Sequence, residues 1–433
     1  MRVALIEASD PQRPSQVYMP MGLAYLKSWL ERGSRHQVLL ARTISDALAF
    51  QPQAVGISAV SPNFPHARAL AQSVRRQSGI PIIIGGPHIS SSPQTLPTEF
   101  TAGVLGEGEV TFSELLDLLE NTPSPRSKDL AKIAGLAYHA DRQEAASSGQ
   151  SVCINSPRAM IENIDDVPFP DRSWAEPNVP LWSFSSRGCP FHCTFCSTAH
   201  FWSRYRLHSP AYVAQELKQM LLSRRPSLHI FMDDLFAANL ERLHQLKAHF
   251  AKELPYSVPL SVTVRADLVT EAICQALVDL NVRFCHLGIE SASDRVLSYL
   301  KAQTTTVEIN QRALNILQKY KLSAVGSFII GAPGEEEEDI AATWKFISDN
   351  LETGRMQSFS FGPLVAFPGT KVWEYGCEKG IIDPDNIDWR SLDIDLRAFD
   401  LNKYTLFSPL ERRRFGEWFD RFHERWSRQF KHH

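Results

Sequence analysis

The sequence predicts an α/β protein with an N-terminal doubly wound, Rossmann-like domain, a partial (β/α)6 barrel and a C-terminal helical tail. Two observations point to this fold class. Short apolar runs alternate with helical patterns over residues 1–120, and the alternation resumes at residue 182. Strands that are apolar throughout and separated by helices are typical of parallel sheets covered on both faces. With 433 residues, the chain is also too long for one ordinary core.

The first region carries the strand and helix signals of a doubly wound sheet. Apolar runs predict strands over residues 3–6, 37–41, 54–60, 81–84 and 103–106. Apolar residues at helical spacing predict helices over residues 22–30, 66–76 and 110–119. In such a sheet the ligand lies beyond the carboxyl ends of the strands.

The second region repeats a strand–helix unit six times. Its predicted strands cover residues 182–186, 229–233, 260–265, 282–290, 324–331 and 359–364. Its predicted helices cover residues 211–222, 240–252, 271–280, 307–319 and 339–350. Units of this length suit a parallel barrel or partial barrel. The tail over residues 410–430 reads as a packing helix rich in Arg, Trp and Phe.

A polar stretch separates the two regions. Residues 121–175 include Thr122-Pro123-Ser124-Pro125 and Pro168-Phe169-Pro170, which favour turns and loops, with a small hairpin expected around residues 134–138. The expected divisions are a first domain over residues 1–125, a linker over 126–175, a barrel over 176–375 and a partly helical C-terminal extension over 376–433.

The composition narrows the class of protein. Hydrophobic residues make up 43% and charged residues 21%, an ordinary globular balance. The net charge of -3 provides no long-range attraction for nucleic acid, so no nucleic-acid partner is expected. No run of about 18 apolar residues occurs and the N-terminus does not read as a signal peptide, so we expect no membrane association and a cytoplasmic protein.

Three of the seven cysteines form a metal-ligand motif. Cys189, Cys193 and Cys196 have the spacing C-x3-C-x2-C, whereas an odd total count is a poor basis for a disulfide framework. Three thiolates can bind three irons of a four-iron cluster and leave the fourth iron open. The motif follows a predicted strand, at the barrel end where active sites form. The alternative is a structural zinc site with His192 or His200 as the fourth ligand.

The segment from Ser186 to Cys196 resembles the signature of the radical S-adenosylmethionine (SAM) superfamily, and the similarity continues to about residue 375. The resemblance implies that the cluster cleaves SAM reductively. It also implies SAM contacts at Phe195, which precedes the third cysteine, and near the ends of the later barrel strands. The strand-end residues are Asp233, Asp234, Arg265, Glu290, Ser291 and Gly331. The alternative for Arg265 and Glu290 is a structural ion pair between the two.

The first region resembles the cobalamin-binding domain found in a branch of this superfamily. The resembling segments are residues 19–26, Gly85-Gly86-Pro87-His88 and Gly106-Glu107-Gly108-Glu109. Gly85, Gly86 and Gly106 would give the backbone room to approach cobalamin. The loops over residues 7–20 and 58–65 would line its pocket. Because no Asp-x-His-x-x-Gly motif occurs, no histidine ligand to cobalt is expected and His88 reads as a turn residue. The alternative is a domain that only serves as a scaffold.

These resemblances imply an enzyme with a four-iron cluster, SAM and cobalamin, transferring a methyl group to a small molecule. An electron donor such as flavodoxin or ferredoxin would be its partner. A second hypothesis keeps the cluster without cobalamin and gives rearrangement, cyclisation or transfer of another SAM-derived group such as 3-amino-3-carboxypropyl. A third is a non-enzymatic metal-bearing interaction protein. The sequence does not identify the substrate, because specificity depends on local sites rather than on folds.

Overall fold

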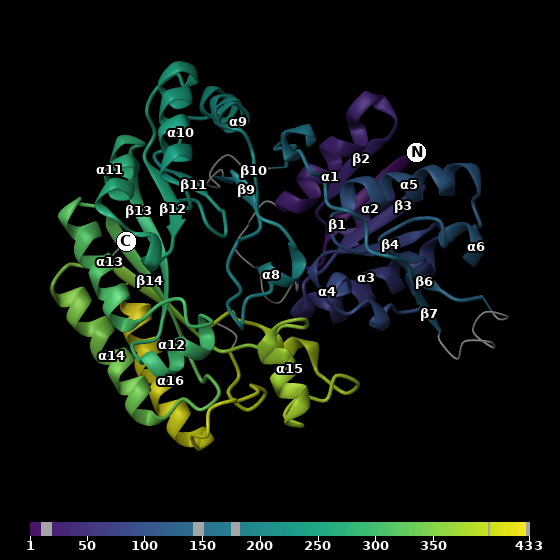
Figure 1. Ribbon diagram of the computed structural model, residues 1–433. Helices are drawn as coiled ribbons and strands as arrows, with labels where there is room; N and C mark the ends of the chain where they lie inside the picture. Colours follow the sequence, from purple (N-terminus) through teal and green to yellow (C-terminus); the bar gives the residue numbers. More distant parts are fainter. Residues whose placement is uncertain (10–19, 142–150, 175–181, 397–398, 430–433) are drawn as a thin grey trace. The chain divides into compact units, whose positions relative to one another are not determined.

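The computed structural model describes residues 1–9, 20–141, 151–174, 182–396 and 399–429 (Figure 1). The chain forms two compact units. The first contains Met1–Val179 together with Asp388–Leu392, and the second contains Pro180–Ile387 and Asp393–His433. The fold class expected from the sequence is confirmed in both units.

The first unit is built on one mixed sheet. Its strand order is β2-β1-β3-β4-β5-β6-β7, in which β1 to β5 are parallel and β6 and β7 are antiparallel. The strands are β1 (Arg2–Glu7), β2 (Gln37–Ala41), β3 (Ala54–Ser58), β4 (Ile82–Gly85), β5 (Ala102–Val104), β6 (Leu136–His139) and β7 (Val152–Ile154). The order 2-1-3-4-5 is that of a flavodoxin-like sheet, whose ligand site lies at the β1/β3 switch point.

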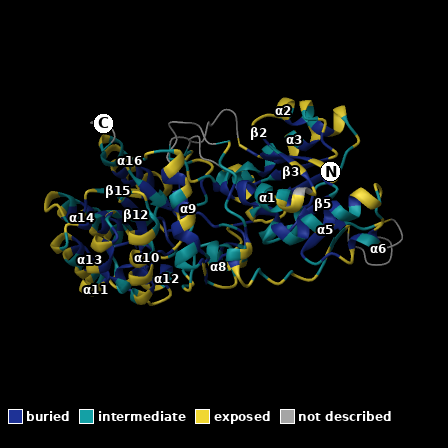
Figure 2. Ribbon diagram, turned by 90° about the horizontal axis from the view of Figure 1, so that it is seen from above, coloured by how far each residue is buried: buried dark blue, intermediate teal, exposed yellow. Residues whose placement is uncertain are grey.

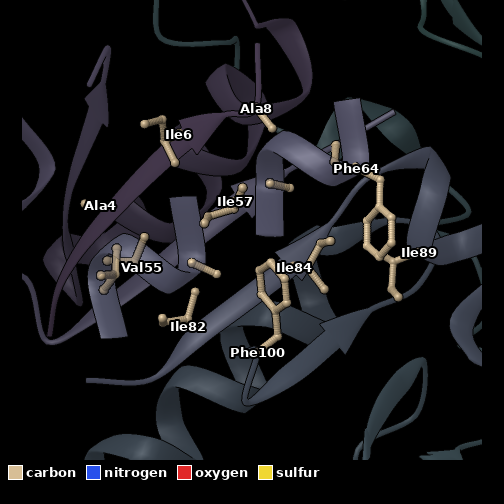
Figure 3. Close-up of a cluster of buried hydrophobic side chains, with 14 of the residues drawn as sticks. Ala4, Ile6, Ala8, Val55, Ile57, Phe64, Ile82, Ile84, Ile89 and Phe100 are labelled. Carbon is tan, nitrogen blue, oxygen red and sulfur yellow. The ribbon is translucent and has the colours of Figure 1, made fainter. Parts of the chain in front are cut away.

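Helices cover both faces of this sheet. The main helices are α1 (Met21–Glu31), α2 (Ile44–Ala49), α3 (Phe64–Gln77), α4 (Pro87–Ser91), α5 (Gly108–Asn121) and α6 (Ser127–Leu130). Alternate strand residues such as Ile6, Ile57 and Ile84 pack with α2 and α3 in one buried cluster (Figure 3). The intervening residues face α1 and α5, which contact each other. Each fully buried Ile contributes about 1.5–3 kcal/mol to this core.

The stretch expected as a linker contributes secondary structure to the first unit. β6 pairs with the edge strand β5, and β7 pairs with β6. The sequence signal was weak because the two strands are short, with four and three residues. Their pairing covers the edge of β5 and makes the short strand β7 the edge of the sheet.

The second unit contains a six-stranded parallel sheet in the described residues, with order β15-β14-β13-β12-β11-β8. Its strands are β8 (Trp182–Ser183), β11 (His229–Phe231), β12 (Leu260–Val264), β13 (Val282–Glu290), β14 (Ser323–Ile330) and β15 (Ser358–Pro363). The sequential order of neighbouring strands is that of the expected partial barrel.

Helices cover the outer face of this sheet. They are α9 (Pro210–Ser223), α10 (Leu240–Glu253), α11 (Glu271–Asp279), α13 (Val307–Lys319), α14 (Glu337–Glu352) and the tail helix α16 (Arg412–Arg428). Two further helices, α12 (Asp294–Leu300) and α15 (Lys371–Glu378), bond to Thr194 instead. Figure 2 shows exposed residues on α10, α11, α13 and α14, whereas strand β12 is mostly buried. The tail helix packs against β15 through Phe419 and Phe422, which contact Phe361. None of the helices in the described ranges combines the length and apolar character needed to cross a membrane.

A segment late in the chain completes the core of the first unit. Trp389 lies edge-on to His88, with ring centroids 4.7 Å apart, and His88 stacks on Phe64 at 3.8 Å. The ring nitrogens of His88 are 3.1 Å from the hydroxyls of Ser61 and Thr95. His88 is therefore a buried core residue at the start of α4, and not the turn residue that the sequence suggested.

His88 makes the stability of the first unit depend on pH. Burial lowers its pKa to about 3, whereas an unfolded chain has a histidine pKa of about 6.5. Between these values the unfolded state binds the proton more readily, so the free energy of unfolding should decrease as the pH falls below about 6.5. We expect a lower urea midpoint at about pH 5 than at about pH 7, with a smaller decrease in His88→Gln. The exposed His244→Gln should keep the full decrease; equal decreases in all three proteins would contradict the prediction.

Candidate active site

A buried carboxylate shapes the entrance to the cysteine loop. Asp233 follows β11 and accepts four hydrogen bonds of 2.7–2.9 Å, from the backbone N–H and hydroxyl of both Ser185 and Ser186. Burial raises the pKa of Asp233 to about 6. Because these groups bind the carboxylate, the strand expected over residues 182–186 is divided into β8 and a second short strand, β9 (Ser186–Arg187).

The cysteine loop is the connection of a small antiparallel ribbon. β9 pairs with β10 (Arg206–Leu207), and the loop between them contains the short helix α8 (Thr198–Phe201). Gly188 begins the loop with a φ of 86°, and a Cβ there would lie 2.7 Å from the carbonyl oxygen of Arg204. This position therefore requires glycine both for its backbone conformation and for its packing.

The three motif cysteines lie on this loop as free, half-buried thiols. Cys196 N–H donates to the carbonyl of Cys193 at 3.1 Å, which folds the second and third cysteines into one turn. Burial raises the pKa of Cys189 to about 11 and also raises that of Cys196. Cluster assembly must therefore displace thiol protons. Half-buried thiols on a turn-rich loop at the sheet's carboxyl end fit a cluster that keeps one iron accessible.

Thr194 anchors the loop, a contact that the sequence did not reveal. Its N–H and hydroxyl donate to the carbonyls of Leu300 and Tyr299 at 3.0 and 3.1 Å, at the end of α12. Its own carbonyl accepts from Val372 N–H at 3.2 Å, at the start of α15. The next residue, Phe195, packs against the apolar cluster beneath the loop. The hydrogen bonds between Thr194 and these two helices therefore hold Cys193 and Cys196 in place.

Arg265 and Glu290 have separate partners. Arg265 Nε lies 2.9 Å from Asp267 Oδ1, and Glu290 Oε1 lies 2.9 Å from Lys301 Nζ. The alternative expected from the sequence, in which Arg265 and Glu290 pair with one another, is therefore wrong. Asp267 lies two residues after Arg265 at the end of β12, whereas Glu290 ends β13 and Lys301 follows α12.

A β-bulge turns Glu290 toward the inner face of the sheet. The register of β13 against β14 shifts between Gly288 and Glu290, and Glu290 has a φ of 63°, unusual for a residue with a side chain. A Cβ at Gly288 would lie 2.3 Å from the Glu290 carboxylate, so that carboxylate lies over Gly288. Lys301 was missed because a lysine at the end of a helix is an ordinary surface feature. Here it is only 6% exposed.

The other residues expected to contact SAM have local structural partners. Asp234 accepts a hydrogen bond from the Thr198 hydroxyl at 2.9 Å. The fully buried Ser291 hydroxyl lies 3.2 Å from that of Thr343 on α14. Gly331 has a φ of 89° and donates its N–H to the buried Glu335, whose pKa is raised by burial to about 8. SAM contacts by Asp234, Ser291 and Gly331 remain predictions.

The first unit contains a cavity of about 130 Å³ on the α1/α5 face of its sheet. It is lined mainly by glycines and apolar side chains, with Ser58 and Glu109 as polar members. The glycines are Gly22, Gly56, Gly85, Gly86, Gly106 and Gly108. Engineered apolar cavities of about 150 Å³ bind benzene, so a flat aromatic group fits here. The structure thus brings Gly85, Gly86 and Gly106 together, as the sequence predicted; of the loop over residues 7–20, residues 10–19 lie outside the described residues.

His88 offers no free nitrogen to this cavity. Both ring nitrogens face hydroxyls of Ser61 and Thr95, and the side chain is fully buried. The residues lining the cavity fit a cobalamin held without His88 as a cobalt ligand. The cavity extends inward from the carboxyl ends of β3, β4 and β5, where a doubly wound sheet binds its ligand.

Two family models match the chain. Residues 183–347 match the radical SAM superfamily, and residues 14–116 match the B12 binding domain. The first range contains the cysteine loop and four of the six sheet strands in full, β11 to β14. The second contains the glycines that line the cavity, at positions 22 to 108.

Known proteins resemble the chain over most of its length. It is 30% identical over 414 residues to the uncharacterized methyltransferase PH0819 of Pyrococcus horikoshii, covering 90% of this chain and 82% of that protein. It is 25% identical over 460 residues to the anaerobic magnesium-protoporphyrin IX monomethyl ester cyclase of Rubrivivax gelatinosus, covering 96% and 81%. The fold resembles that of TsrM from Kitasatospora setae, a radical SAM methyltransferase solved with cobalamin and a [4Fe-4S] cluster, with a TM-score of 0.72, 18% identity, and coverage of 98% and 87%.

The geometry at Gly188 leads to a prediction about cluster binding. Gly188→Ala would place a methyl group 2.7 Å from the Arg204 carbonyl oxygen and 2.9 Å from Trp202 Cβ, and would displace the start of the loop. We expect the variant to bind much less iron on anaerobic reconstitution while keeping its circular dichroism spectrum. Gly380→Ala is the matched control, with a φ of 66° and nothing within 4 Å of its Cβ. It carries the same backbone strain of about 1–2 kcal/mol and should bind iron normally; wild-type iron in Gly188→Ala would contradict the prediction.

Proposed function

The chain belongs to the radical SAM superfamily and carries a B12-binding domain, and from this we propose that it is a cobalamin-dependent methyltransferase acting on a small molecule. The family match supports a four-iron cluster, and we infer that the three motif cysteines ligate it rather than a structural zinc with His192 or His200. It also excludes a non-enzymatic interaction protein.

The observation that carries the proposal is the glycine-lined cavity in the first unit. A domain retained only as a scaffold would gain stability from filling that space, since each missing methyl-sized group costs about 1 kcal/mol of packing. Glycine at positions such as Gly22 and Gly106, where a Cβ would meet nothing within 4 Å, keeps it open instead. The nucleotide tail of cobalamin ends in a flat aromatic base, which is the kind of group that the cavity admits.

The bound groups supply the difficult chemistry, and the protein orients and shields them. The reduced cluster supplies the electron that cleaves SAM, and cobalamin supplies a cobalt that receives and releases a methyl group. The residues of this chain hold these groups in place. Asp233 and Thr194 fix the cysteine loop, while Lys301 and Glu290 present one buried charged pair on the inner face of the sheet. An inward carboxylate there can accept hydrogen bonds from the ribose or amine of SAM.

Cyclisation is the second candidate. It is favoured by the similarity to the protoporphyrin ester cyclase of Rubrivivax gelatinosus, which spans 96% of this chain. The same cluster would serve it without cobalamin, because fold does not fix the reaction. In both cases we infer that the electron comes from a one-electron carrier such as flavodoxin or ferredoxin.

The experiment that tests methyl transfer uses anaerobically reconstituted protein and SAM labelled in its methyl group, with and without cobalamin. We expect label on cobalamin, S-adenosylhomocysteine as a product, and label in a small molecule when a metabolite extract is added. Cys193→Ala is the negative control for formation of 5′-deoxyadenosine. Cleavage of SAM that is unaffected by omitting cobalamin, with no label on cobalamin, would reject the proposal and favour cyclisation or another SAM-derived transfer.

The cavity gives a prediction that needs no substrate. A Cβ at Gly22, the second residue of α1, meets nothing within 4 Å, so Gly22→Leu would place a side chain in the cavity without backbone strain. We expect the Kd for hydroxocobalamin to rise roughly tenfold or more, a loss of about 1.4 kcal/mol. Gly79→Leu, also in open space but outside the cavity lining, should bind normally. An unchanged Kd in Gly22→Leu would show that cobalamin does not use this cavity.

A further inference from the structure

Arg265 lies against a cluster ligand. Its Nη1 is 3.5 Å from Cys193 Sγ, within hydrogen-bonding distance for sulfur, and its guanidinium lies 3.6 Å from the centre of the Phe191 ring. Both residues belong to the cysteine loop, whereas Arg265 follows the distant strand β12. The sequence suggested Arg265 as a SAM contact, but the described structure directs its donors to protein groups around the cluster site.

The guanidinium is fixed on two further sides. Asp267 accepts from Nε at 2.9 Å and faces Nη2 at 3.4 Å, and Thr304 Oγ1 accepts from Nη2 at 2.8 Å. The Arg265 side chain is 9% exposed. A planar cation held by a carboxylate, a hydroxyl and an aromatic ring has few alternative positions, so its orientation toward Cys193 is determined by the fold.

The loop that carries Thr304 is itself strained. Ala302 and Gln303 both have left-handed backbone conformations, with φ values of 52° and 62°. Thr304 then donates its hydroxyl to the Lys301 carbonyl at 2.6 Å. Such strained backbone conformations persist only where surrounding contacts determine them. In this loop, those contacts place the Thr304 hydroxyl against the Arg265 guanidinium and the Lys301 ammonium group against the Glu290 carboxylate.

We propose that Arg265 is a positioning residue that donates to the Cys193 thiolate and raises the reduction potential of the cluster. The inference rests on the cluster of the proposed function. Reduction transfers one electron from a one-electron carrier to the cluster and moves no proton. It adds one negative charge beside the guanidinium, so the cation and its hydrogen bond stabilise the reduced form more than the oxidised form. Hydrogen bonds and charges near the sulfurs set such potentials.

The sign of the change in the midpoint potential distinguishes a positioning role of Arg265 from a general loss of structure. Removing the cation should make the midpoint potential more negative, because the reduced form loses its partner. Removing the nearby negative charge of Asp267 should make it less negative, because the guanidinium is then less neutralised. A purely structural role would shift both variants in the same direction or shift neither.

The test is a redox titration of the anaerobically reconstituted full chain, followed by electron paramagnetic resonance, without SAM, cobalamin or substrate. Iron and sulfide contents and the visible spectrum establish that each variant holds its cluster. We expect a more negative potential in Arg265→Gln, a smaller negative shift in Arg265→Lys, and a positive shift in Asp267→Asn. Arg283→Gln, an exposed arginine at the start of β13, is the matched control and should titrate like wild type.

Unchanged potentials in the Arg265 variants with intact clusters would overturn the proposal, as would shifts of the same sign in Arg265→Lys and Asp267→Asn. If Arg265→Gln holds no cluster, these two variants decide the question. The titration requires only the cluster, so failure of methyl transfer would leave its outcome unaffected. Conversely, unchanged potentials would not count against methyl transfer.

Discussion

The bonding of Asp233 to Ser185 and Ser186 is the interaction on which the candidate active site depends. It ends the first barrel strand after two residues and diverts the chain into the ribbon that carries the cysteine loop. A carboxylate with four donors is well satisfied although it is buried, which compensates much of the cost of removing it from water. Without that turn, the chain would continue as part of the sheet. The cysteine thiols would then no longer lie at the carboxyl end of the sheet.

The loop is then held by contacts from several later elements. Thr194 binds the ends of α12 and α15, and Arg265 reaches Cys193 from the end of β12. A loop fixed at both its entrance and its middle loses little further conformational entropy when it ligates a cluster. The same residues that position the thiols thus also determine the charges around them.

The first unit also places its candidate ligand site at the carboxyl ends of parallel strands. Parallel strands in the order 2-1-3-4-5 place all their carboxyl ends on one edge, and glycines on α1, α5 and the strand ends leave space there. Trp389 and His88 fill the opposite face of the sheet, so the unit is well packed on one side and open on the other. A sheet with one filled and one hollow face is suited to hold a large ligand without losing its core.

The sequence by itself determined the features that depend on local periodicity and spacing. Strand and helix positions, the C-x3-C-x2-C motif and the glycine pairs follow from residues close together in the chain, and β2, β13 and α13 have the bounds predicted for them. Only the tertiary structure decided which distant groups meet: Lys301 with Glu290, Arg265 with Cys193, and Trp389 with His88. It also decided that β6 and β7 pair onto the edge of the first sheet. The physical reason is that such contacts depend on strand register and loop direction, where a shift of one residue redirects every side chain and leaves the local pattern unchanged.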